Sequence, residues 1–384
     1  MILRVIGSID ELRGLNPAWD DLWLRSEVAL PTLRAEHVAL WVDSFAADAP
    51  FRALVVEDGN RFVAALPLVQ QRRGHFLKTG SLPTNLWSAS GDLLLDPACD
   101  VARATDLLAE GLARGPWSLA WFELVPLGMP RWQVMLAAIE RRGMATSEQT
   151  LYTIGQVDIA GDWSTYEASR SRNQRQQTRK LGRRIEREGL TRLVRHSNIA
   201  ATDLASLLQR GFDVEDRSWK GTAGTSVLHT PGAFAFYLRQ AELLNARGEL
   251  QLVFLEHDER PIAFEYGWLA KETYFSPKVG YDREFASYRP GQLLRSKLYE
   301  EFHAAHDCRL VDFLGPLSDA TRRWSNRQYD ISRLVLAGAG RTAHWSLRLI
   351  EALQAARRKA RKRDAAELET SASEECSLDP TAAP

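Results

Sequence analysis

The residues that most directly indicate chemistry are Tyr288, Arg289, Pro290 and Gly291, which stand between two segments of different periodicity. The segment before them, from Thr273, reads as a strand, and the segment after them places its leucines near one face of a helix. A helix that begins at a Pro-Gly loop offers its first N–H groups and the positive end of its dipole to an anion. Gly291 also leaves room for a ligand to approach the backbone. The pattern therefore indicates a site for a phosphate or pyrophosphate, although Pro-Gly can also do no more than start a helix.

A run of arginines earlier in the chain indicates a second feature that could bind an anion. These residues recur every three or four positions, so a helix over residues 162–188 would place them on one face: Arg172, Arg175, Arg179, Arg183 and Arg187. Such a run is most often a solvated face. The alternative is a basic wall beside an anionic ligand, such as the phosphates of a cofactor. Nucleic acid fits less well, because no aromatic residues interleave with these arginines.

The overall composition is that of an ordinary globular protein. Hydrophobic residues make up 45% of the 384, and 49 basic residues balance 49 acidic ones, so no net field favours nucleic acid or a membrane surface. Three cysteines, Cys99, Cys308 and Cys376, lie far apart and lack metal-ligand spacing, which favours a reducing compartment without disulfides. We see neither a secretory signal nor a membrane-spanning segment, and we expect a cytoplasmic protein.

The elements that must position these residues follow a mixed α/β order. Strands and helices alternate over a first domain, residues 1–160, and again over a second domain, residues 161–340, which starts with the basic connecting helix 162–189. Residues 341–384 are expected to form a helix and a disordered tail. We therefore predict an α/β fold with a mixed sheet.

The two domains repeat one pattern. The hairpin over residues 51–69 corresponds to that over residues 251–269, and each hairpin follows a pair of expected helices. This indicates a tandem duplication of one α/β unit. The first copy has no counterpart to the Arg-Pro-Gly helix start at residues 289–291, so we expect the second copy to be the active one.

Short motifs in the second domain resemble a known family in their order and spacing. They are Trp219-Lys220-Gly221, Pro261-Ile262-Ala263-Phe264, Lys278-Val279-Gly280-Tyr281-Asp282, Tyr288-Arg289-Pro290-Gly291 and Asp312-Phe313-Leu314. With the arginine-rich segment before them, they resemble the CelD-like acyltransferases of the GNAT type that are linked to bacterial cellulose and exopolysaccharide synthesis. The resemblance covers roughly residues 15–337 and is more specific in the second half.

The resemblance implies a tandem GNAT-like acyl-CoA N-acyltransferase fold, in which the sheet splays at its centre and an acyl-CoA inserts. It implies acetyl-CoA or another acyl-CoA as cosubstrate and no metal. In such folds the pyrophosphate lies on the loop and helix start after the central strand, here Tyr288, Arg289, Pro290, Gly291, Gln292 and Leu293. One departure stands at Arg322-Arg323-Trp324, because relatives often carry a Tyr-Lys pair before this tryptophan.

Acyl transfer also needs a base for the acceptor and an acid for the leaving thiolate. Glu265 interrupts an apolar strand and is our first choice for the base if its face lines the cleft; otherwise it is an outward-facing strand residue. Tyr281 and Asp282, just before the phosphate loop, are candidates for acid and base. Trp219 and Lys220 are candidates for binding the acceptor.

Three functions remain open from the sequence. The first is acyl transfer to a small-molecule or saccharide acceptor, with no nucleic acid partner and no membrane span. The second is a Fem-like transferase that uses charged tRNA, with which the arginine run is compatible. The third is a non-catalytic binding or assembly protein that keeps the fold. An open loop at residues 288–293 would favour the first, and a side chain that fills the cleft would favour the third.

Overall fold

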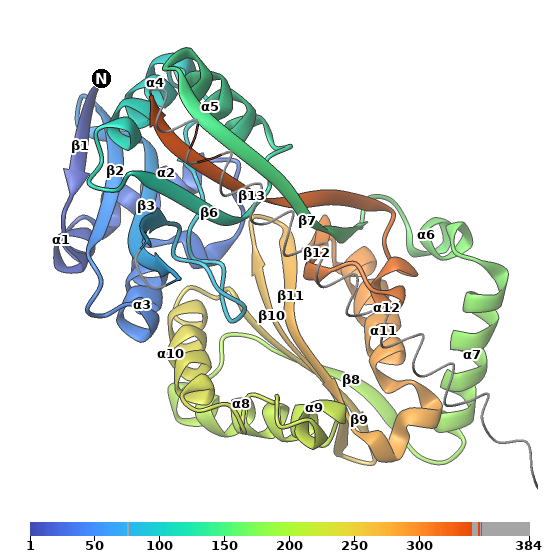
Figure 1. The fold of residues 1–384 in the computed structure, drawn as a ribbon. Helices are drawn as coiled ribbons and strands as arrows, with labels where there is room; N and C mark the ends of the chain where they lie inside the picture. Colours follow the sequence, from blue (N-terminus) through green and yellow to red (C-terminus); the bar gives the residue numbers. More distant parts are fainter. Residues whose placement is uncertain (75–76, 340–344, 346, 348–384) are drawn as a thin grey trace, which may run out of the picture.

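One mixed sheet runs through the whole molecule (Figure 1). The computed structural model describes residues 1–74, 77–339, 345 and 347. Within them, thirteen strands stand in the order β1-β2-β3-β4-β6-β13-β7-β12-β11-β10-β9-β8, with β5 beside β3. Their bounds are β1 Ile2–Ile6, β2 Phe51–Asp58, β3 Arg61–Arg73, β4 Leu77–Ser81, β5 Leu94–Leu95, β6 Leu119–Val125, β7 Met144–Asp158, β8 Thr191–His196, β9 Leu250–His257, β10 Arg260–Ala270, β11 Thr273–Tyr281, β12 Leu310–Pro316 and β13 Arg327–Ala339.

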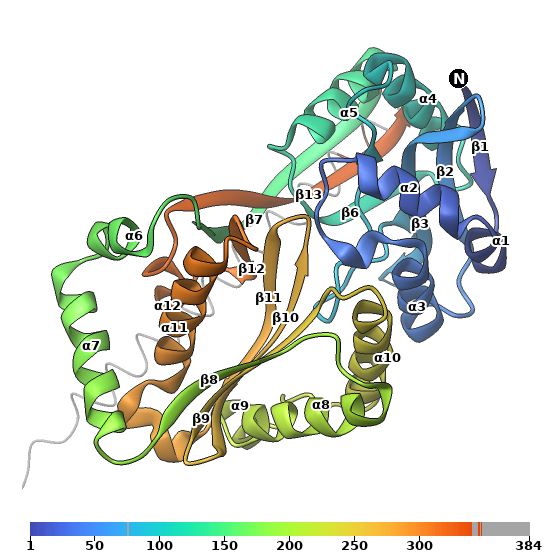
Figure 2. The ribbon, with the colours of Figure 1, turned by 180° about the vertical axis from the view of Figure 1, so that it is seen from behind.

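Helices cover both faces of this sheet. In the first half they are α1 Ile9–Gly14, α2 Asn16–Arg25, α3 Ala35–Phe45, α4 Val101–Ala113 and α5 Pro130–Arg141, with the 3-10 turn η1 Pro31–Leu33. In the second half they are α6 Trp163–Ser169, α7 Arg172–Glu186, α8 Ala201–Asp216, α9 Trp219–Thr222, α10 Ala233–Asn245, α11 Pro290–Ala305 and α12 Asp319–Arg322, with η2 Arg283–Tyr288. Figure 2 shows α8 and α10 on one face of the second half's sheet, and α11 on the other with α7 outside it.

The two halves have the same topology, which confirms the predicted tandem mixed α/β fold. In each half a strand and two packed helices lead to three antiparallel strands, then a helix, and then a strand parallel to the third one. The last strand of each half lies in the other half's sheet. β7 pairs with β12 of the second half, β13 pairs with β6 of the first, and β7 and β13 pair with each other along most of their length.

The alternation of side chains along β10 explains how its sheet is buried on both faces. Phe264, Tyr266 and Trp268 belong to an aromatic core with α8 and α10. Ala263 belongs to a separate core beneath α11, where Glu265, two residues on, is also completely buried. A strand buried on two sides presents successive residues to two different cores.

One expectation for the elements needs correction. The long basic helix over residues 162–188 is two helices, because Ser171 caps α7 by accepting a hydrogen bond from Gln174 N (3.3 Å), and Arg170 lies over the Trp324 ring (3.5 Å to its centroid). β7 and β13 are longer than their apolar stretches, since they pair with each other. The helix and tail predicted for residues 341–384 lie, but for residues 345 and 347, outside the described residues.

In the described part of the chain, no helix is both long enough and apolar enough to cross a bilayer.

Candidate functional site

The parallel strands β11 and β12 separate soon after they meet, and this opens the sheet. They pair at three positions, of which the last is Phe275 with Asp312. Immediately after Phe275, β11 carries a bulge, because Ser276 and Pro277 together stand opposite Gly267 of β10. A bulge leaves backbone groups outside the ladder and turns the strand. The opening between the strands is the splay that the family resemblance implies.

Beyond the splay, α11 begins at a loop that is open to solvent. Arg289 adopts a left-handed conformation (φ 51°, ψ 57°), and its carbonyl accepts hydrogen bonds from Gln292 N and Leu293 N. A Cβ placed on Gly291 would meet no atom within 4 Å. The backbone at the start of α11 is therefore accessible, as the predicted phosphate site requires.

The residues on either side of Gly291 fix this loop against α7. Leu293 is buried, and its side chain lies close to Gly182. Tyr288 is also buried; its hydroxyl donates to Glu188, and the Arg184 guanidinium lies 4.7 Å from the centre of its ring. Tyr288 and Leu293 thus hold the loop.

A hollow of about 420 Å³ lies between the first turns of α7, the start of α11 and the end of α12. It is lined by Ser171, Asn173, Gln174, Gln177, Arg289 and Arg323. Arg289 Nη1 donates to Gln177 Oε1 at 2.8 Å, so one guanidinium is fixed at the edge of the hollow. Two arginines beside the start of a helix fit the phosphates of an acyl-CoA. Arg323 belongs to the segment where the sequence departs from its relatives, and it supplies the second of these charges.

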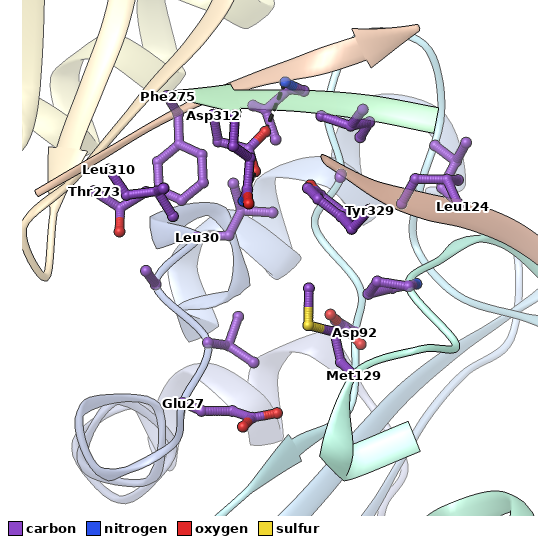
Figure 3. Close-up of a pocket in the computed structure, with 18 of the residues that line it drawn as sticks. Glu27, Leu30, Asp92, Leu124, Met129, Thr273, Phe275, Leu310, Asp312 and Tyr329 are labelled. Atoms are coloured by element: carbon purple, nitrogen blue, oxygen red, sulfur yellow. Dashed lines mark hydrogen bonds between the residues drawn. The ribbon is translucent and has the colours of Figure 1, made fainter. Parts of the chain in front are cut away.

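On the opposite face of the splay, the two halves enclose a cavity of about 290 Å³ (Figure 3). Phe275, Asp312 and Tyr329 line it from the second half's strands, and Glu27 and Asp92 from the loops of the first half. Figure 3 shows Asp312 and Tyr329 on one side of the cavity, across from Glu27 and Asp92. The point where the sheet opens therefore faces a partly open cavity with acidic groups on both walls.

Asp312 is the carboxylate at the point where the strands separate. Its side chain is almost completely buried, and it accepts hydrogen bonds from Gln156 Nε2 and from Leu314 N, both at 2.8 Å. Burial raises the pKa of Asp312 above its usual range, although these hydrogen bonds oppose the shift. The Tyr329 hydroxyl lies against the same carboxylate, and burial raises the pKa of this tyrosine well above normal. A fixed, buried carboxylate with a raised pKa has the properties of a general base.

The first half has an apolar residue at the matching position. Phe122 pairs with Leu334 immediately before a break in register, as Asp312 pairs with Gln156 before the equivalent break. Two residues farther on, Leu124 and Leu314 both have positive φ angles, 61° and 53°. A fully buried phenylalanine, Phe122, therefore stands in the first half where the second half has the carboxylate of Asp312.

Glu265 lies on the other face of the sheet from this cavity. Its side chain is completely buried under α11, so it is not an outward-facing strand residue. Arg295 Nε lies 3.5 Å from Glu265 Oε2, and burial raises the pKa values of the neighbouring Tyr274 and Tyr299. The structure places Glu265 in a buried polar cluster, and its predicted role as base remains a prediction.

The other predicted acid–base residues stand at the far end of β11. Tyr281 packs against the core beneath α11. Asp282 is buried and accepts hydrogen bonds from Arg217 Nε (2.8 Å) and Arg260 Nη2 (2.6 Å), and it caps η2. Burial opposes ionisation, but the hydrogen bonds from Arg260 and Arg217 outweigh it and hold the pKa of Asp282 below its usual value. The structure does not bring these two residues together with Asp312.

The two predicted acceptor residues differ in their surroundings. Trp219 begins α9 and is 58% exposed, so it is available to a ligand. The ammonium group of Lys220 already makes two hydrogen bonds within the protein, because its Nζ donates to Glu215 Oε1 (2.6 Å) and to Val279 O (3.0 Å). Neither residue lines the cavity beside Asp312.

Part of the predicted arginine face is present on α7. Arg179, Arg183 and Arg187 line a shallow hollow of about 470 Å³ together with Gln176, Lys180 and Arg184. Arg179 pairs with Glu167 of α6 at 2.5 Å. The remaining basic groups form an exposed surface beside the start of α11.

No grouping of three or more His, Cys, Asp or Glu side chains in the described residues is placed to share a metal ion.

Comparison with known proteins supports the predicted fold. Residues 172–330 match the family described as acetyltransferase (GNAT) domain. The crystal structure of FemX has a TM-score of 0.59 at 10% identity, and the match covers 87% of this chain and 97% of that one. The C-terminal (DUF2156) domain of a proposed lysylphosphatidylglycerol synthetase from Agrobacterium fabrum has a TM-score of 0.52 at 14% identity, and the match covers 90% of this chain and 96% of that one.

A conserved protein of unknown function from Bacteroides thetaiotaomicron has a TM-score of 0.50 at 13% identity, with 88% of this chain and 99% of that one covered. No curated protein matches the sequence. At these identities the structural likeness concerns the fold alone. The chain therefore has a tandem GNAT fold over its two halves, and residues 172–330 of the second half are similar to an acetyltransferase (GNAT) domain.

Proposed function

We propose that this protein transfers an acyl group from acetyl-CoA or another acyl-CoA to an amine or hydroxyl of a sugar or polysaccharide-related acceptor. The observation that carries the proposal is Asp312, a buried carboxylate that lies where β11 and β12 separate and that faces the cavity between the halves. The GNAT domain match and the resemblance to CelD-like acyltransferases support the choice of reaction and the class of acceptor.

The start of α11 would hold the nucleotide end of the cosubstrate. Arg289 and Arg323 offer charge at the hollow beside it, and Gly291 offers unobstructed backbone. The thioester supplies the activated acyl carbon. The bulge at Ser276 and Pro277 interrupts the ladder beside the splay. Of these two residues only Ser276 has a backbone N–H, and this group would be the donor to a developing oxyanion.

Asp312 would act on the acceptor from the cavity. It accepts the proton that the acceptor nitrogen or oxygen loses as that atom bonds to the acyl carbon, while the bond from the acyl carbon to sulfur breaks. The proton then passes to the departing sulfur, so the carboxylate is regenerated and free CoA leaves as the thiol. Gln156 and the Leu314 N–H keep the Asp312 carboxylate oriented throughout.

A Fem-like transfer from charged tRNA is the second candidate function. It is supported by the likeness to FemX and by the exposed basic residues of α7, which could contact a phosphate backbone. A non-catalytic role is less well supported, because no side chain fills the space above Gly291.

Calorimetric titration with acetyl-CoA, free CoA and longer acyl-CoAs tests the proposal, using a Gly291→Trp variant. We expect micromolar binding that Gly291→Trp weakens by at least about a hundredfold, since the indole would occupy the approach to the helix start. Gly14→Trp is the matched control, because a Cβ at Gly14 in α1 is equally unobstructed. Absence of CoA binding, with binding of charged tRNA instead, would favour the second candidate function.

A further inference from the structure

The side of α7 that faces away from the core carries a row of cations. The helix packs on the core beneath α11 through Leu181 and Ile185, and Arg183 stands about 200° around the helix from both of them. Exposed basic residues recur along this outward side, and we call them the basic face: Arg172, Arg179, Lys180, Arg183 and Arg187. Figure 1 and Figure 2 both show α7 at the outer edge of the second half, away from the first half. The basic face is therefore open to a large partner.

Few carboxylates lie near enough to neutralise the basic face. Arg179 pairs with Glu167 of α6 at 2.5 Å. Glu186 is the one acidic residue within α7, and it pairs with Lys297 of α11 at 3.3 Å. Three members of the basic face form no ion pair with any described residue: Lys180, Arg183 and Arg187. Most of the positive charge is thus available to an external anion.

The basic face works against the stability of its own helix. Like charges four residues apart repel each other, as Arg179 and Arg183 do, and as Arg183 and Arg187 do. The first turn of α7 contains no acidic residue, although the helix dipole favours one there, and Arg172 stands in that turn instead. Such a conflict between the local sequence and the local fold is characteristic of functional surfaces.

The shape and surroundings of the basic face favour a lipid surface over other polyanions. It forms a shallow hollow of about 470 Å³, of whose six lining residues five are cations and none is acidic or aromatic. The absence of aromatic residues from this lining disfavours single-stranded nucleic acid, which such side chains bind by stacking. Leu190 follows three residues after Arg187 and is 70% exposed, and its backbone N–H is fixed by Asp258 Oδ1 at 2.8 Å. Cations followed by an exposed apolar side chain match anionic headgroups above an apolar layer.

From these observations we infer that the basic face of α7 binds the anionic headgroups of a lipid bilayer and that Leu190 inserts among them. The helix would lie along the membrane surface, with α11 on its far side. The inference goes beyond the proposed function and does not depend on it, because none of the residues of the basic face lines the hollow beside Arg289.

The test is co-sedimentation of the full chain with vesicles of two compositions, phosphatidylcholine alone and equal parts of phosphatidylcholine and phosphatidylglycerol. We expect binding to the anionic vesicles only, and we expect salt to weaken it because the attraction to the headgroups is screened. Arg183→Gln/Arg187→Gln should weaken this binding by about thirtyfold, the contribution of two cations near the surface. Arg103→Gln/Arg114→Gln is the matched control, since it removes two exposed arginines from α4 and its C-terminal cap and should leave binding unchanged.

Leu190→Ser tests the apolar contact. It should weaken binding to the anionic vesicles by about tenfold and leave the salt dependence unchanged, because it removes no charge. Equal binding to both kinds of vesicle, or binding to neither, would overturn the inference. So would unchanged binding by Leu190→Ser or by Arg183→Gln/Arg187→Gln. Binding of uncharged tRNA in place of the vesicles would also overturn it and would favour the Fem-like function.

Titration of every variant with CoA keeps the two proposals separate. Arg183→Gln/Arg187→Gln should bind CoA as the wild type does. A loss of CoA affinity in this variant would assign the basic face to the cosubstrate site and overturn the inference. If the wild type binds anionic vesicles but no CoA, the inference holds and the proposed function fails.

Discussion

At the scale of single residues, the chemistry proposed here depends on where Asp312 is held. Its carboxylate is removed from water, which raises its pKa, but Gln156 and the Leu314 N–H keep it partly stabilised as an anion. Burial is the larger of these influences, so the pKa of Asp312 lies above that of an ordinary aspartate. The geometry at Leu314, with its positive φ, aims the backbone N–H at the carboxylate.

Asp312→Asn should abolish acyl transfer while preserving the fold. We expect turnover to fall by about a hundredfold to ten-thousandfold, the usual contribution of a general base. Because the folded pKa of Asp312 lies above its unfolded value, ionisation at neutral pH destabilises the native state, and this destabilisation is lost as the pH falls through the folded pKa. The variant should therefore be at least as stable as the wild type at pH 7, as urea unfolding would measure.

The pH profile separates a base from a structural carboxylate. For the wild type, kcat/KM should fall on the acid side with a midpoint above the ordinary range of an aspartate, since the carboxylate must be ionised to accept a proton. A midpoint near 4 in the wild type, or a variant that turns over normally, would exclude Asp312 as the base.

The sequence indicates the loop at residues 288–293 more readily than it indicates Asp312. Pro290 and Gly291 act through backbone conformation, which short-range sequence determines. Asp312 differs, because both Asp312 and Asp282 lie in motifs that resemble the family. Only the folded structure separates them, since it places Asp312 at the splay, opposite the loops of the first half, and pairs Asp282 with Arg217. An acidic residue inside an otherwise apolar strand was the one available signal, and Glu265 carries the same signal.

At the scale of elements, Glu265 and Arg295 join β10 to α11 beneath the proposed cosubstrate loop. Both side chains are at least nine-tenths buried, and the ion pair is accompanied by polar atoms that have no hydrogen-bond partner among the described residues, among them Tyr274 Oη and Tyr299 Oη. Removing one charge would leave the other buried and unpaired, which costs far more than removing both.

Arg295→Met should therefore destabilise the protein by about 3–5 kcal/mol, and the double variant Glu265→Gln/Arg295→Met by clearly less. Urea unfolding measures both. The exposed pair Arg239–Glu242 on α10 is the control, and Arg239→Met there should cost less than about 1 kcal/mol. A folded Glu265→Gln variant that loses turnover would instead assign the base to Glu265.

Periodicity predicted most of the elements because each carries its own pattern. The helix predicted after the Pro-Gly loop is present as α11, and the hairpins of both halves appear with nearly the expected bounds. Periodicity did not predict the secondary structure where contacts between distant segments determine it. Arg170 leaves the helical path to stack on Trp324, and the polar residues of β7 are extended because β13 lies beside them.

At the scale of the whole molecule, neither half is complete without the other. β7 supplies the strand beside β12, and β13 supplies the strand beside β6. The proposed acceptor cavity also takes walls from both halves. The duplication was visible in the sequence, but the exchange of strands was not, because pairing partners so far apart leave no local pattern.

Residues 1–160 and 161–384 produced separately should each fail to form a monomeric folded domain, because each would expose an unpaired central strand edge. Coexpression should restore a soluble complex with CoA binding, and size-exclusion chromatography with circular dichroism would measure this. Cooperative, monomeric folding of residues 161–384 alone would contradict the shared architecture.

The exchanged strands also set the order of events during synthesis. β7 ends at Asp158 and its partner β13 begins at Arg327, so about 170 further residues must be made before the central pairing can form. At typical elongation rates, β7 therefore remains without its partner β13 for on the order of ten seconds or more. The first half must therefore persist as an incomplete sheet at the ribosome, and chaperones that shield open strand edges should matter more for this chain than for one whose domains close in succession.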